Sequence, residues 1–539
     1  MMFVMSFAPY GCDGILIRIE ADIRRGIPGI DVSGLAAGAV REAKDRIRTA
    51  FRNSGYNFPN DRILINLAPA DVKKDEAALD LPMALAIAQS AGISPPVESA
   101  MVLGELELSG RVRPVRGTLA ATACALSSGI RAFIVPLENS GEAEILAPAG
   151  SVAGVSSLKD AIEALEFHYK TGSFPPMPAK RKLENMPSGD GLYEGDFAEV
   201  HGQSRYKRVL EIAAAGGHNL LVFGPPGAGK TMLARRLPSI MTPLDKWEAV
   251  AVTKLHSLAG RLNNNNLPSI TTAGNSAGQN RDYCCALINR PPFRAPHHSA
   301  SAEGILGGGR TVRPGEASLA HLGVLFLDEA PEFKSNVLQA LREPLEDKVF
   351  TISRAEGPVR LPADFQLLLA ANPCPCGKLG LKPDSHGGCL CSGDNINRYW
   401  KKLGGALLDR IELRVAVKTP PAFVMPERSE ESSAAIAERV RKAVEKQRSR
   451  YKDTGVRRNA SLSGALLEKY CPLSKSAENA LCKAAEKIGF SGRAYHGIIR
   501  SARTIADLEG NDSIEVEHIL EAVQHRRFGD DPYDVFQVK

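Results

Sequence analysis

The chain has 539 residues, of which 44% are hydrophobic and 24% are charged, so its composition excludes a disordered or fibrous protein. Lys and Arg number 67 against 61 Asp and Glu, and the net charge of +6 permits a polyanionic partner without requiring one. This length predicts about three domains. The first residues lack a basic stretch and break at Pro9, and no apolar run is long enough to span a membrane. We therefore expect a cytoplasmic protein with reduced cysteines.

Residues 1–165 alternate short apolar strands with helical stretches and predict an α/β domain with its own core. The expected strands are 15–19, 63–67, 101–108 and 132–135, and the expected helices are 39–53, 79–90 and 119–128. Residues 166–192 are expected to be a linker, because the composition over 171–188 shifts to Pro, Lys, Gly and Ser.

The segment from Asn66 to Asp75, followed by a helix from Leu79, resembles the protease domain of Lon, in which a serine precedes this helix. Alignment with Lon places Ala78 at the serine position and Leu119 at the position of its partner lysine. A serine–lysine dyad needs a hydroxyl and an amine, so we predict that this domain is inactive as a peptidase. Lys73 and Lys74 are expected to be solvated loop charges and not catalysts.

Residues 220–231 combine an apolar run with a glycine-rich turn that ends in Lys230 and Thr231. All constrained positions of G-x-x-x-x-G-K-[ST] are present between a predicted strand and a predicted helix, so the turn should cradle phosphates with its backbone N–H groups. Lys230 would neutralise the β- and γ-phosphates, and Thr231 would hold Mg²⁺. The residues expected to contact nucleotide or its metal are Gly224, Pro225, Pro226, Gly227, Ala228, Gly229, Lys230, Thr231, Met232 and Asp328.

Two further apolar strands within the predicted core, residues 193–417, end in polar side chains. Residues 324–327 lead to Asp328 and Glu329 at the edge where α/β sheets bind ligands. Asp328 would coordinate Mg²⁺ through water, and Glu329 would polarise the attacking water. The alternative is that these two carboxylates are only an acidic cap on the strand. The strand over 365–371 ends at Asn372, whose amide has both a donor and an acceptor.

A cysteine-rich loop, residues 374–391, follows Asn372. Cys374, Cys376, Cys389 and Cys391 form two C-x-C pairs, and His386 lies between them. Four thiolates could bind a structural Zn²⁺ in a tetrahedral site, and reduced, unligated cysteines are the main alternative.

Two basic segments are candidates for contact with nucleic acid, and residues 263–281 nearby predict a mobile Asn-, Ser- and Gly-rich loop. Residues 350–361 predict a hairpin that separates Arg354 from Arg360. Basic side chains of both segments could contact phosphates, but those over 291–316 could equally brace a subunit interface. A metal pair at the two adjacent histidines is not expected, because neighbours on a strand point in opposite directions. The basic and histidine residues over 291–316 are Arg294, His297, His298, Arg310 and Arg313.

Residues 418–539 predict a helical lid, because amphipathic patterns run over 436–451, 462–470, 475–488, 493–508 and 516–526. Basic residues accumulate over 439–458, where they could meet DNA or simply be solvated, and a solvated face is the more common case.

Taken together, these motifs resemble the ComM/YifB family of magnesium-chelatase-like AAA+ ATPases. The resemblance implies a P-loop AAA+ α/β core with a helical C-terminal lid, preceded by a Lon-protease-like α/β domain, with ATP and Mg²⁺ as cofactors. One departure is Glu76-Ala77-Ala78-Leu79, where the family usually has Gly-Ser-Ser-Phe. The shared segments are 66–71, 224–231, 293–299, 307–309, 313–316, 319–333, 372–377 and 407–413.

The resemblance also implies roles for individual residues. Residues 200–203 would wrap the adenine, and Asn372 would be sensor 1, which holds the lytic water. Arg410 would be the arginine finger supplied by the neighbouring subunit, and Arg493, after Ser491 and Gly492, would be sensor 2.

Better-understood members of this family look like hexameric DNA helicases that drive branch migration during natural transformation. We therefore expect a ring-shaped, ATP-driven homo-oligomer acting on single-stranded or branched DNA. The alternative is a remodeller of a protein partner like the chelatase subunit itself. An ATP-dependent protease is disfavoured by Ala78 and Leu119.

Overall fold

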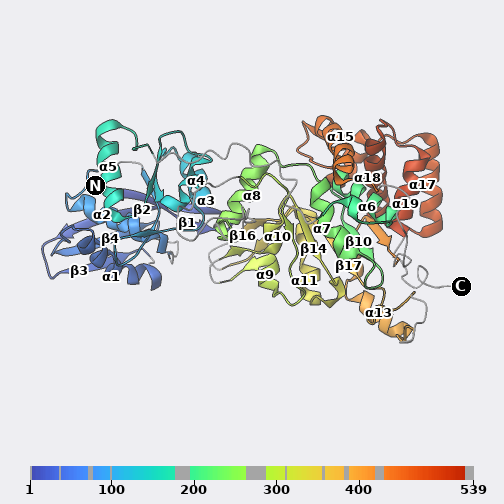
Figure 1. The fold of residues 1–539 in the computed structure, drawn as a ribbon, viewed down its shortest axis with the longest axis horizontal. Helices are drawn as coiled ribbons and strands as arrows, with labels where there is room; N and C mark the ends of the chain where they lie inside the picture. Colours follow the sequence, from blue (N-terminus) through green and yellow to red (C-terminus); the bar gives the residue numbers. More distant parts are fainter. Residues whose placement is uncertain are drawn as a thin grey trace.

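The computed structural model describes residues 3–34, 38–70, 74, 77–96, 100–176, 195–262, 287–309, 312–354, 358–380, 388–418 and 430–527. The molecule is elongated: the N-terminal domain occupies one end, a parallel sheet the middle and a group of helices the other end (Figure 1). None of the described helices is both long enough and apolar enough to cross a membrane.

The N-terminal domain is built on a seven-stranded mixed sheet of order β3-β4-β2-β1-β5-β8-β9. Its interior is apolar because buried side chains of the strands pack against those of the helices, and α2 (Asp80–Ser90) is buried over almost its whole length. The strands of the domain are β1 (Phe3–Tyr10), β2 (Asp13–Arg24), β3 (Gly29–Ser33), β4 (Arg62–Ala68), β5 (Ala100–Val102), β6 (Glu105–Leu106), β7 (Val112–Arg113), β8 (Ala132–Pro136) and β9 (Val152–Val155). Its helices are α1 (Gly38–Asn53), α2 (Asp80–Ser90), α3 (Thr118–Ser127), α4 (Ser140–Glu144) and α5 (Leu158–Thr171).

The middle of the molecule is a five-stranded sheet of order β11-β14-β17-β10-β18 in which every neighbouring pair is parallel. The central strands are fully buried, as continuous apolar runs in a parallel sheet predict. Because all strands point the same way, the loops that follow them gather at one edge. The strands are β10 (Leu220–Phe223), β11 (Phe293–Arg294), β14 (Val324–Leu327), β17 (Gln366–Ala371) and β18 (Leu413–Ala416).

Two small hairpins and several helices surround this sheet. The hairpins pair β12 (Gly307–Gly308) with β13 (Arg313–Pro314), and β15 (Val349–Ile352) with β16 (Val359–Pro362). The helices are α6 (Ser204–Gly216), α7 (Lys230–Ile240), α8 (Lys246–Leu258), α9 (Ala302–Leu306), α10 (Glu316–Leu319), α11 (Ser335–Ala340), α12 (Arg342–Asp347), α13 (Gly393–Lys401) and α14 (Gly405–Leu408).

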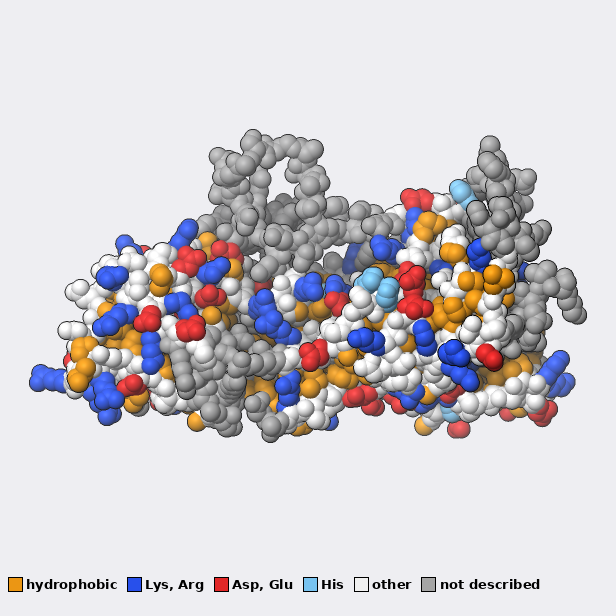
Figure 2. All heavy atoms as spheres, turned by 90° about the horizontal axis from the view of Figure 1, so that it is seen from below, with side chains coloured by type: hydrophobic (Ala, Val, Ile, Leu, Met, Phe, Trp, Pro, Cys, Tyr) orange, Lys and Arg blue, Asp and Glu red, His pale blue; other side chains and the backbone are white. Residues whose placement is uncertain are grey.

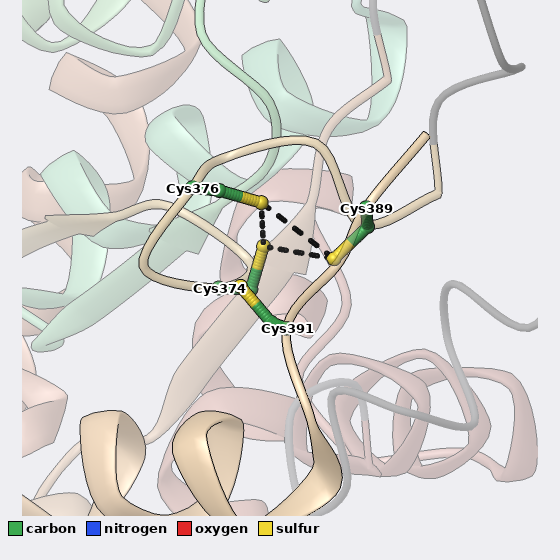
Figure 3. A group of neighbouring side chains, drawn as sticks. All are labelled: Cys374, Cys376, Cys389 and Cys391. Atoms are coloured by element: carbon green, nitrogen blue, oxygen red, sulfur yellow. Dashed lines mark hydrogen bonds between the residues drawn. The ribbon is translucent and has the colours of Figure 1, made fainter. Parts of the chain in front are cut away.

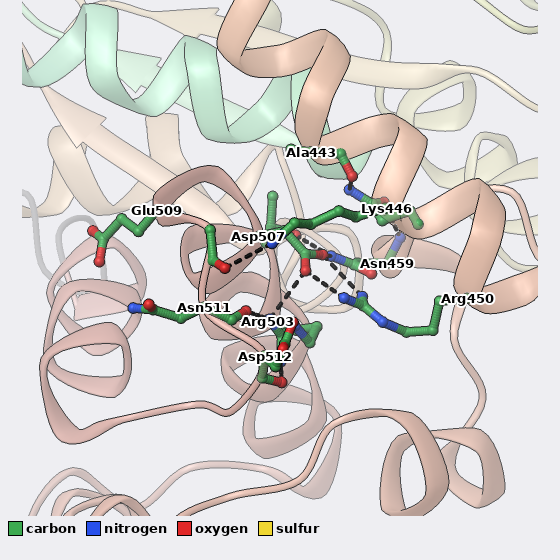
Figure 4. A network of polar contacts seen from close by, with 12 residues as sticks. Ala443, Lys446, Arg450, Asn459, Arg503, Asp507, Glu509, Asn511 and Asp512 are labelled. Carbon is green, nitrogen blue, oxygen red and sulfur yellow. Dashed lines mark hydrogen bonds and ion pairs between the residues drawn. The ribbon is translucent and has the colours of Figure 1, made fainter.

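The C-terminal region is helical, and a buried charged network holds it together (Figure 4). The Asp507 carboxylate pairs with Arg450 at 2.5 Å and with the fully buried Arg503 at 3.0 Å, and it accepts from Asn459 at 2.9 Å. Each charge therefore has a partner, as burial requires. The helices are α15 (Ser433–Tyr451), α16 (Gly464–Tyr470), α17 (Lys475–Ile488), α18 (Gly492–Glu509) and α19 (Val516–Arg527).

Helix α8 joins the N-terminal domain to the central sheet (Figure 1). The Ser257 hydroxyl donates to the buried Glu142 carboxylate at 2.6 Å, and Leu258 belongs to an N-terminal hydrophobic cluster. On its other side, a ring nitrogen of His256 lies 3.1 Å from the carbonyl of Leu319. Burial raises the pKa of Glu142, although hydrogen bonds from Ser257 and Asn139 oppose the shift.

Two expectations for the N-terminal region need correction. Lys74 is not solvated: its side chain is fully buried, and its ammonium donates to the carbonyls of Gly34 at 3.0 Å, Leu67 at 3.2 Å and also Pro69. Three carbonyls can satisfy the three donors of an ammonium, which makes its burial tolerable.

The domain also extends beyond residue 165, since α5 continues to Thr171 and Phe174 is buried in the same core.

Several expected features lie outside the described residues. They include Lys73, Arg310, His386, the loop over 263–281, the turn of the 350–361 hairpin at 355–357 and most of the expected linker.

Candidate active site

The turn between β10 and α7 has the backbone shape of a phosphate cradle. Gly227 and Gly229 have φ angles of 75° and 81°, a left-handed conformation that favours glycine. A Cβ atom at Gly224 would lie 2.3 Å from the carbonyl oxygen of Val417, so no side chain fits there. Helix α7 begins at Lys230, and its first N–H groups are therefore available to an anion. Pro226 is exposed at the turn and Ala228 is buried beneath it.

The Lys230 ammonium is held above the carboxyl ends of the strands. It donates to the carbonyls of Gly224 at 2.6 Å and Pro225 at 3.0 Å, and to the amide oxygen of Asn372 at 3.1 Å. Burial lowers the pKa of Lys230, and the negative charges of Asp328 and Glu329 oppose that shift. The structure thus brings together the expected phosphate lysine and the residue expected to be sensor 1.

The expected metal ligands also meet at this edge. The Thr231 hydroxyl donates to the Asp328 carboxylate at 2.7 Å, although almost a hundred residues separate them. A hydroxyl and a carboxylate are oxygen ligands of the kind that Mg²⁺ prefers. Met232, another residue of the expected nucleotide-binding group, is 43% exposed on the first turn of α7.

Glu329 projects from a strained backbone into a partly open site. Its φ angle is 52°, which a non-glycine residue seldom adopts, and its side chain is 52% exposed. The Nδ1 atom of His298 lies 3.6 Å from its carboxylate. Sequence reasoning did not connect these two residues. The sequence also predicts that His297 and His298 point to opposite sides of a strand. Both residues instead lie beyond the end of β11, and the centroids of their rings are 4.1 Å apart.

The expected arginine finger, Arg410, and the expected sensor 2 residue, Arg493, lie together, but at the opposite edge of the sheet. Arg410 pairs with Glu346 at 2.6 Å, and Arg493 pairs with the same carboxylate. Both guanidinium groups lower the pKa of Glu346, chiefly through the hydrogen bond from Arg410. They line a cavity of about 390 Å³ with Asn219 and Asp409. No sequence motif identifies Glu346 as the partner of these two arginines.

Two other arginines of α18, Arg500 and Arg503, have structural partners. Arg500 donates to the carbonyls of Ala460 and Leu462, and Arg503 is fully buried in the network of Figure 4. Arg493 lines the cavity beside Arg410, as Arg500 does, and its side chain is 43% exposed.

The segment expected to hold the adenine contacts both the cradle and the lid. The Gln203 amide donates to the carbonyls of Ala228 at 3.0 Å and Lys418 at 2.8 Å. The Gly202 N–H donates to Glu430, whose other oxygen lies 2.8 Å from the Lys207 ammonium. This segment therefore lies where the core and the lid meet.

The basic residues considered for nucleic-acid contact fall into two groups. Arg294 donates two hydrogen bonds to Glu316, at 2.6 and 2.9 Å, so its charge is already neutralised within the chain. Arg313 and Arg360 are exposed, and Arg354 donates to the carbonyl of Gly309, which links the two hairpins.

In the basic stretch over 439–458, five arginines pair with carboxylates of the same chain, which supports a structural role for this face. They are Arg439, Arg441, Arg448, Arg450 and Arg457.

The four cysteines of the 374–391 loop converge at the end of β17 (Figure 3). Their sulfur atoms all lie within 4.8 Å of one another, in an arrangement that could hold a metal ion. Cys374 is buried, and Cys376 is exposed.

The expected Lon dyad positions carry no catalytic groups. Ala78 lines a cavity of about 480 Å³ near the junction with the central region, together with Arg113, Arg116 and Arg313. Leu119 is fully buried, and its N–H donates to Glu142.

Comparison with known proteins places the whole chain in one family. Residues 196–273 and 269–423 match the model described as magnesium chelatase, subunit ChlI; residues 19–139 match subunit ChlI of Mg-chelatase, and 430–526 match its C-terminal model. The chain is 38% identical over 533 residues to the uncharacterized protein YifB of Salmonella typhimurium, covering 98% of this chain and 97% of that one.

Two other relatives refine this placement. The competence protein ComM of Haemophilus influenzae is 36% identical over 531 residues, or 98% of this chain and 97% of ComM. A Lon protease of Salinispora arenicola is 24% identical over 168 residues, which is 30% of this chain and 22% of that protein. The chain therefore belongs to the ComM/YifB family of magnesium-chelatase-like AAA+ proteins.

Proposed function

We propose that this protein is a cytoplasmic, ATP-hydrolysing ring motor that acts on DNA, as a helicase that promotes branch migration in recombination or natural transformation. Its cofactors in this proposal are ATP and Mg²⁺, and zinc is a candidate for the cysteine cluster. The domain division proposed from the sequence, with the N-terminal boundary moved to include Phe174, is part of the proposal.

The proposed chemistry follows from the edge of the sheet that carries the cradle. Backbone N–H groups and Lys230 would bind the phosphates, and Thr231 with Asp328 would hold Mg²⁺. Glu329 would polarise the attacking water, and Asn372, which already contacts Lys230, would orient it beside the γ-phosphate.

The observation that supports a ring-shaped assembly is the separation of Arg410 and Arg493 from the phosphate cradle of the same chain. The carbonyl of Arg410 accepts from the side chain of Asn219 at 3.1 Å, which fixes Arg410 at the start of β10, whereas Gly224 and the cradle follow the end of that strand. The five steps from Asn219 to Gly224, at about 3.3 Å each, span about 16 Å.

An arginine side chain cannot bridge that distance, so Arg410 and Arg493 cannot reach the phosphates that their own chain would bind. Each chain offers a cradle at one edge and two arginines at the other, and head-to-tail contact between copies would bring these halves together. A ring closes such contacts, and a hexamer is the proposed form.

The DNA part of the proposal is supported by the two linked hairpins and by the relative called a competence protein. Figure 2 shows Lys and Arg mixed with Asp and Glu over the face in view, with no continuous basic stripe. We therefore place the phosphate contacts on exposed hairpin arginines such as Arg313 and Arg360.

Measurement of ATP hydrolysis and strand displacement, with and without four-way-junction DNA, tests this function. We expect stimulation by DNA that falls steeply as salt rises, and weaker stimulation for Arg313→Ala combined with Arg360→Ala. Arg25→Ala, which removes an exposed charge from the N-terminal domain, is the matched control.

A verified hexamer that hydrolyses ATP but shows neither stimulation nor displacement at low salt would reject DNA as the substrate. That result would leave the alternative, a chelatase-like remodeller of a protein partner.

A further inference from the structure

Three sulfur atoms of the cysteine cluster lie near the spacing of a metal-bound tetrathiolate, and the fourth lies within 4.8 Å of them. Cys374 and Cys376 are 3.3 Å apart, Cys374 and Cys389 are 3.7 Å apart, and Cys376 and Cys389 are 3.6 Å apart (Figure 3). Four sulfurs in a tetrahedron around Zn²⁺, each with a Zn–S bond of about 2.3 Å, would be separated by about 3.8 Å. The separations in this structure approach that value.

The same separations do not describe disulfides. A disulfide bond is only about 2.0 Å long, and all four cysteines are free. Instead, both C-x-C pairs present their sulfurs to a common point, and one sulfur is buried while another is exposed. Four cysteine sulfurs that converge on one point are a ligand set of structural zinc sites.

Backbone N–H groups of the loop point at sulfur atoms of the cluster. The N–H of Leu379 donates to the sulfur of Cys374, and the N–H of Lys378 donates to that of Cys376. Hydrogen bonds of this kind orient thiolates around a metal.

The cluster is attached directly to the proposed site of hydrolysis. Cys374 follows Asn372 after a single proline, and the Pro373 carbonyl accepts from the Trp400 indole at 3.1 Å. On the far side of the turn, a Cβ atom at Gly377 would lie 3.0 Å from the ring of Pro226, so the loop packs closely on the phosphate cradle.

We propose that Cys374, Cys376, Cys389 and Cys391 bind one zinc ion, and that this ion fixes the end of β17 so that Asn372 remains beside Lys230. The four thiolates supply the ligands, and Asn372 is positioned through Pro373, the one residue that separates it from Cys374. The positioning role rests on the proposed ATP hydrolysis, whereas the metal site does not.

Metal analysis of the purified full-length chain tests the site without reference to activity. We expect about one zinc per chain, and its loss in Cys376→Ser combined with Cys391→Ser. Cys482→Ser, which removes an exposed cysteine in α17, should retain the metal. Replacement of zinc by cobalt should give the intense visible absorption of tetrahedral cobalt thiolate. Iron in place of zinc, or a metal-free chain with four freely reactive thiols, would overturn the zinc assignment.

The positioning role predicts a particular kinetic change. Metal loss should lower the turnover number by up to roughly 100-fold because Asn372 moves, while ATP binding changes little because the cradle is intact. In Asn372→Ala, the same cysteine substitutions should add little further loss. Additive losses, or equal weakening of ATP binding, would refute the positioning role even if zinc is present. Lack of any hydrolysis by the wild-type chain would instead count against the proposed function.

Discussion

Mixing two inactive variants should restore ATP hydrolysis if the site is shared between subunits. Lys230→Ala removes the ammonium that contacts the cradle carbonyls and Asn372. Arg410→Ala removes a guanidinium whose backbone is held at Asn219, about 16 Å along β10 from the cradle. Loss of a transition-state arginine slows phosphoryl transfer by about 10³-fold or more, equivalent to at least ~4 kcal/mol. Each variant alone should therefore be nearly inactive.

The mixture has a calculable activity. In a randomly assembled equal mixture, an interface works only when one chain supplies Lys230 and its neighbour supplies Arg410, so about one quarter of the interfaces are competent. Steady-state ATPase rates per chain measure this recovery, and native mass spectrometry verifies mixed rings. As a control, Lys230→Ala mixed with the double variant Lys230→Ala and Arg410→Ala contains no competent interface. Full activity of Arg410→Ala alone, or no recovery in verified mixed rings, would refute the reasoning.

Three further changes test the site and its support. Glu329→Gln should retain ATP binding but hydrolyse it far more slowly, because the amide cannot polarise water; equilibrium binding and single-turnover assays separate the two effects. Asp507→Asn should lower the free energy of unfolding by roughly 3–5 kcal/mol, because two arginines lose their buried partner, whereas the exposed Asp453→Asn should change it little in denaturant titrations. Burial lowers the pKa of His218 from 6.5 to about 3, so only the unfolded chain takes up this proton between those values. Stability should fall by about 1.4 kcal/mol per pH unit as pH decreases through that window, and His218→Gln should reduce this slope by one proton.

The cradle was predictable from the sequence because its chemistry is local. Glycines that must adopt a left-handed backbone, followed by Lys230 and Thr231, are contiguous in the chain. The contact of Thr231 with Asp328 was also accessible, because each follows a buried strand of one parallel sheet and such strand ends meet at a common edge.

Contacts made by unpatterned residues could not be predicted in this way. Glu346 holds Arg410 and Arg493, but its position on α12 depends on how three distant segments pack. Likewise, Lys74 sits in a polar segment that would ordinarily be solvated. Its burial depends on carbonyls from separate parts of the N-terminal domain, which no local pattern encodes.

The joint at α8 limits how the two halves of the molecule can swing. Domains connected by one chain commonly rotate as separate bodies when their interface is small and polar. Here Glu142, only 5% exposed, depends on Ser257 from the other side of the joint for a hydrogen bond, and Leu258 is inserted into the N-terminal core. A hinge motion at this point would remove one of the hydrogen bonds of a buried carboxylate and expose an apolar side chain. A rotation of the nucleotide-binding half would therefore move the N-terminal domain with it, as one rigid body.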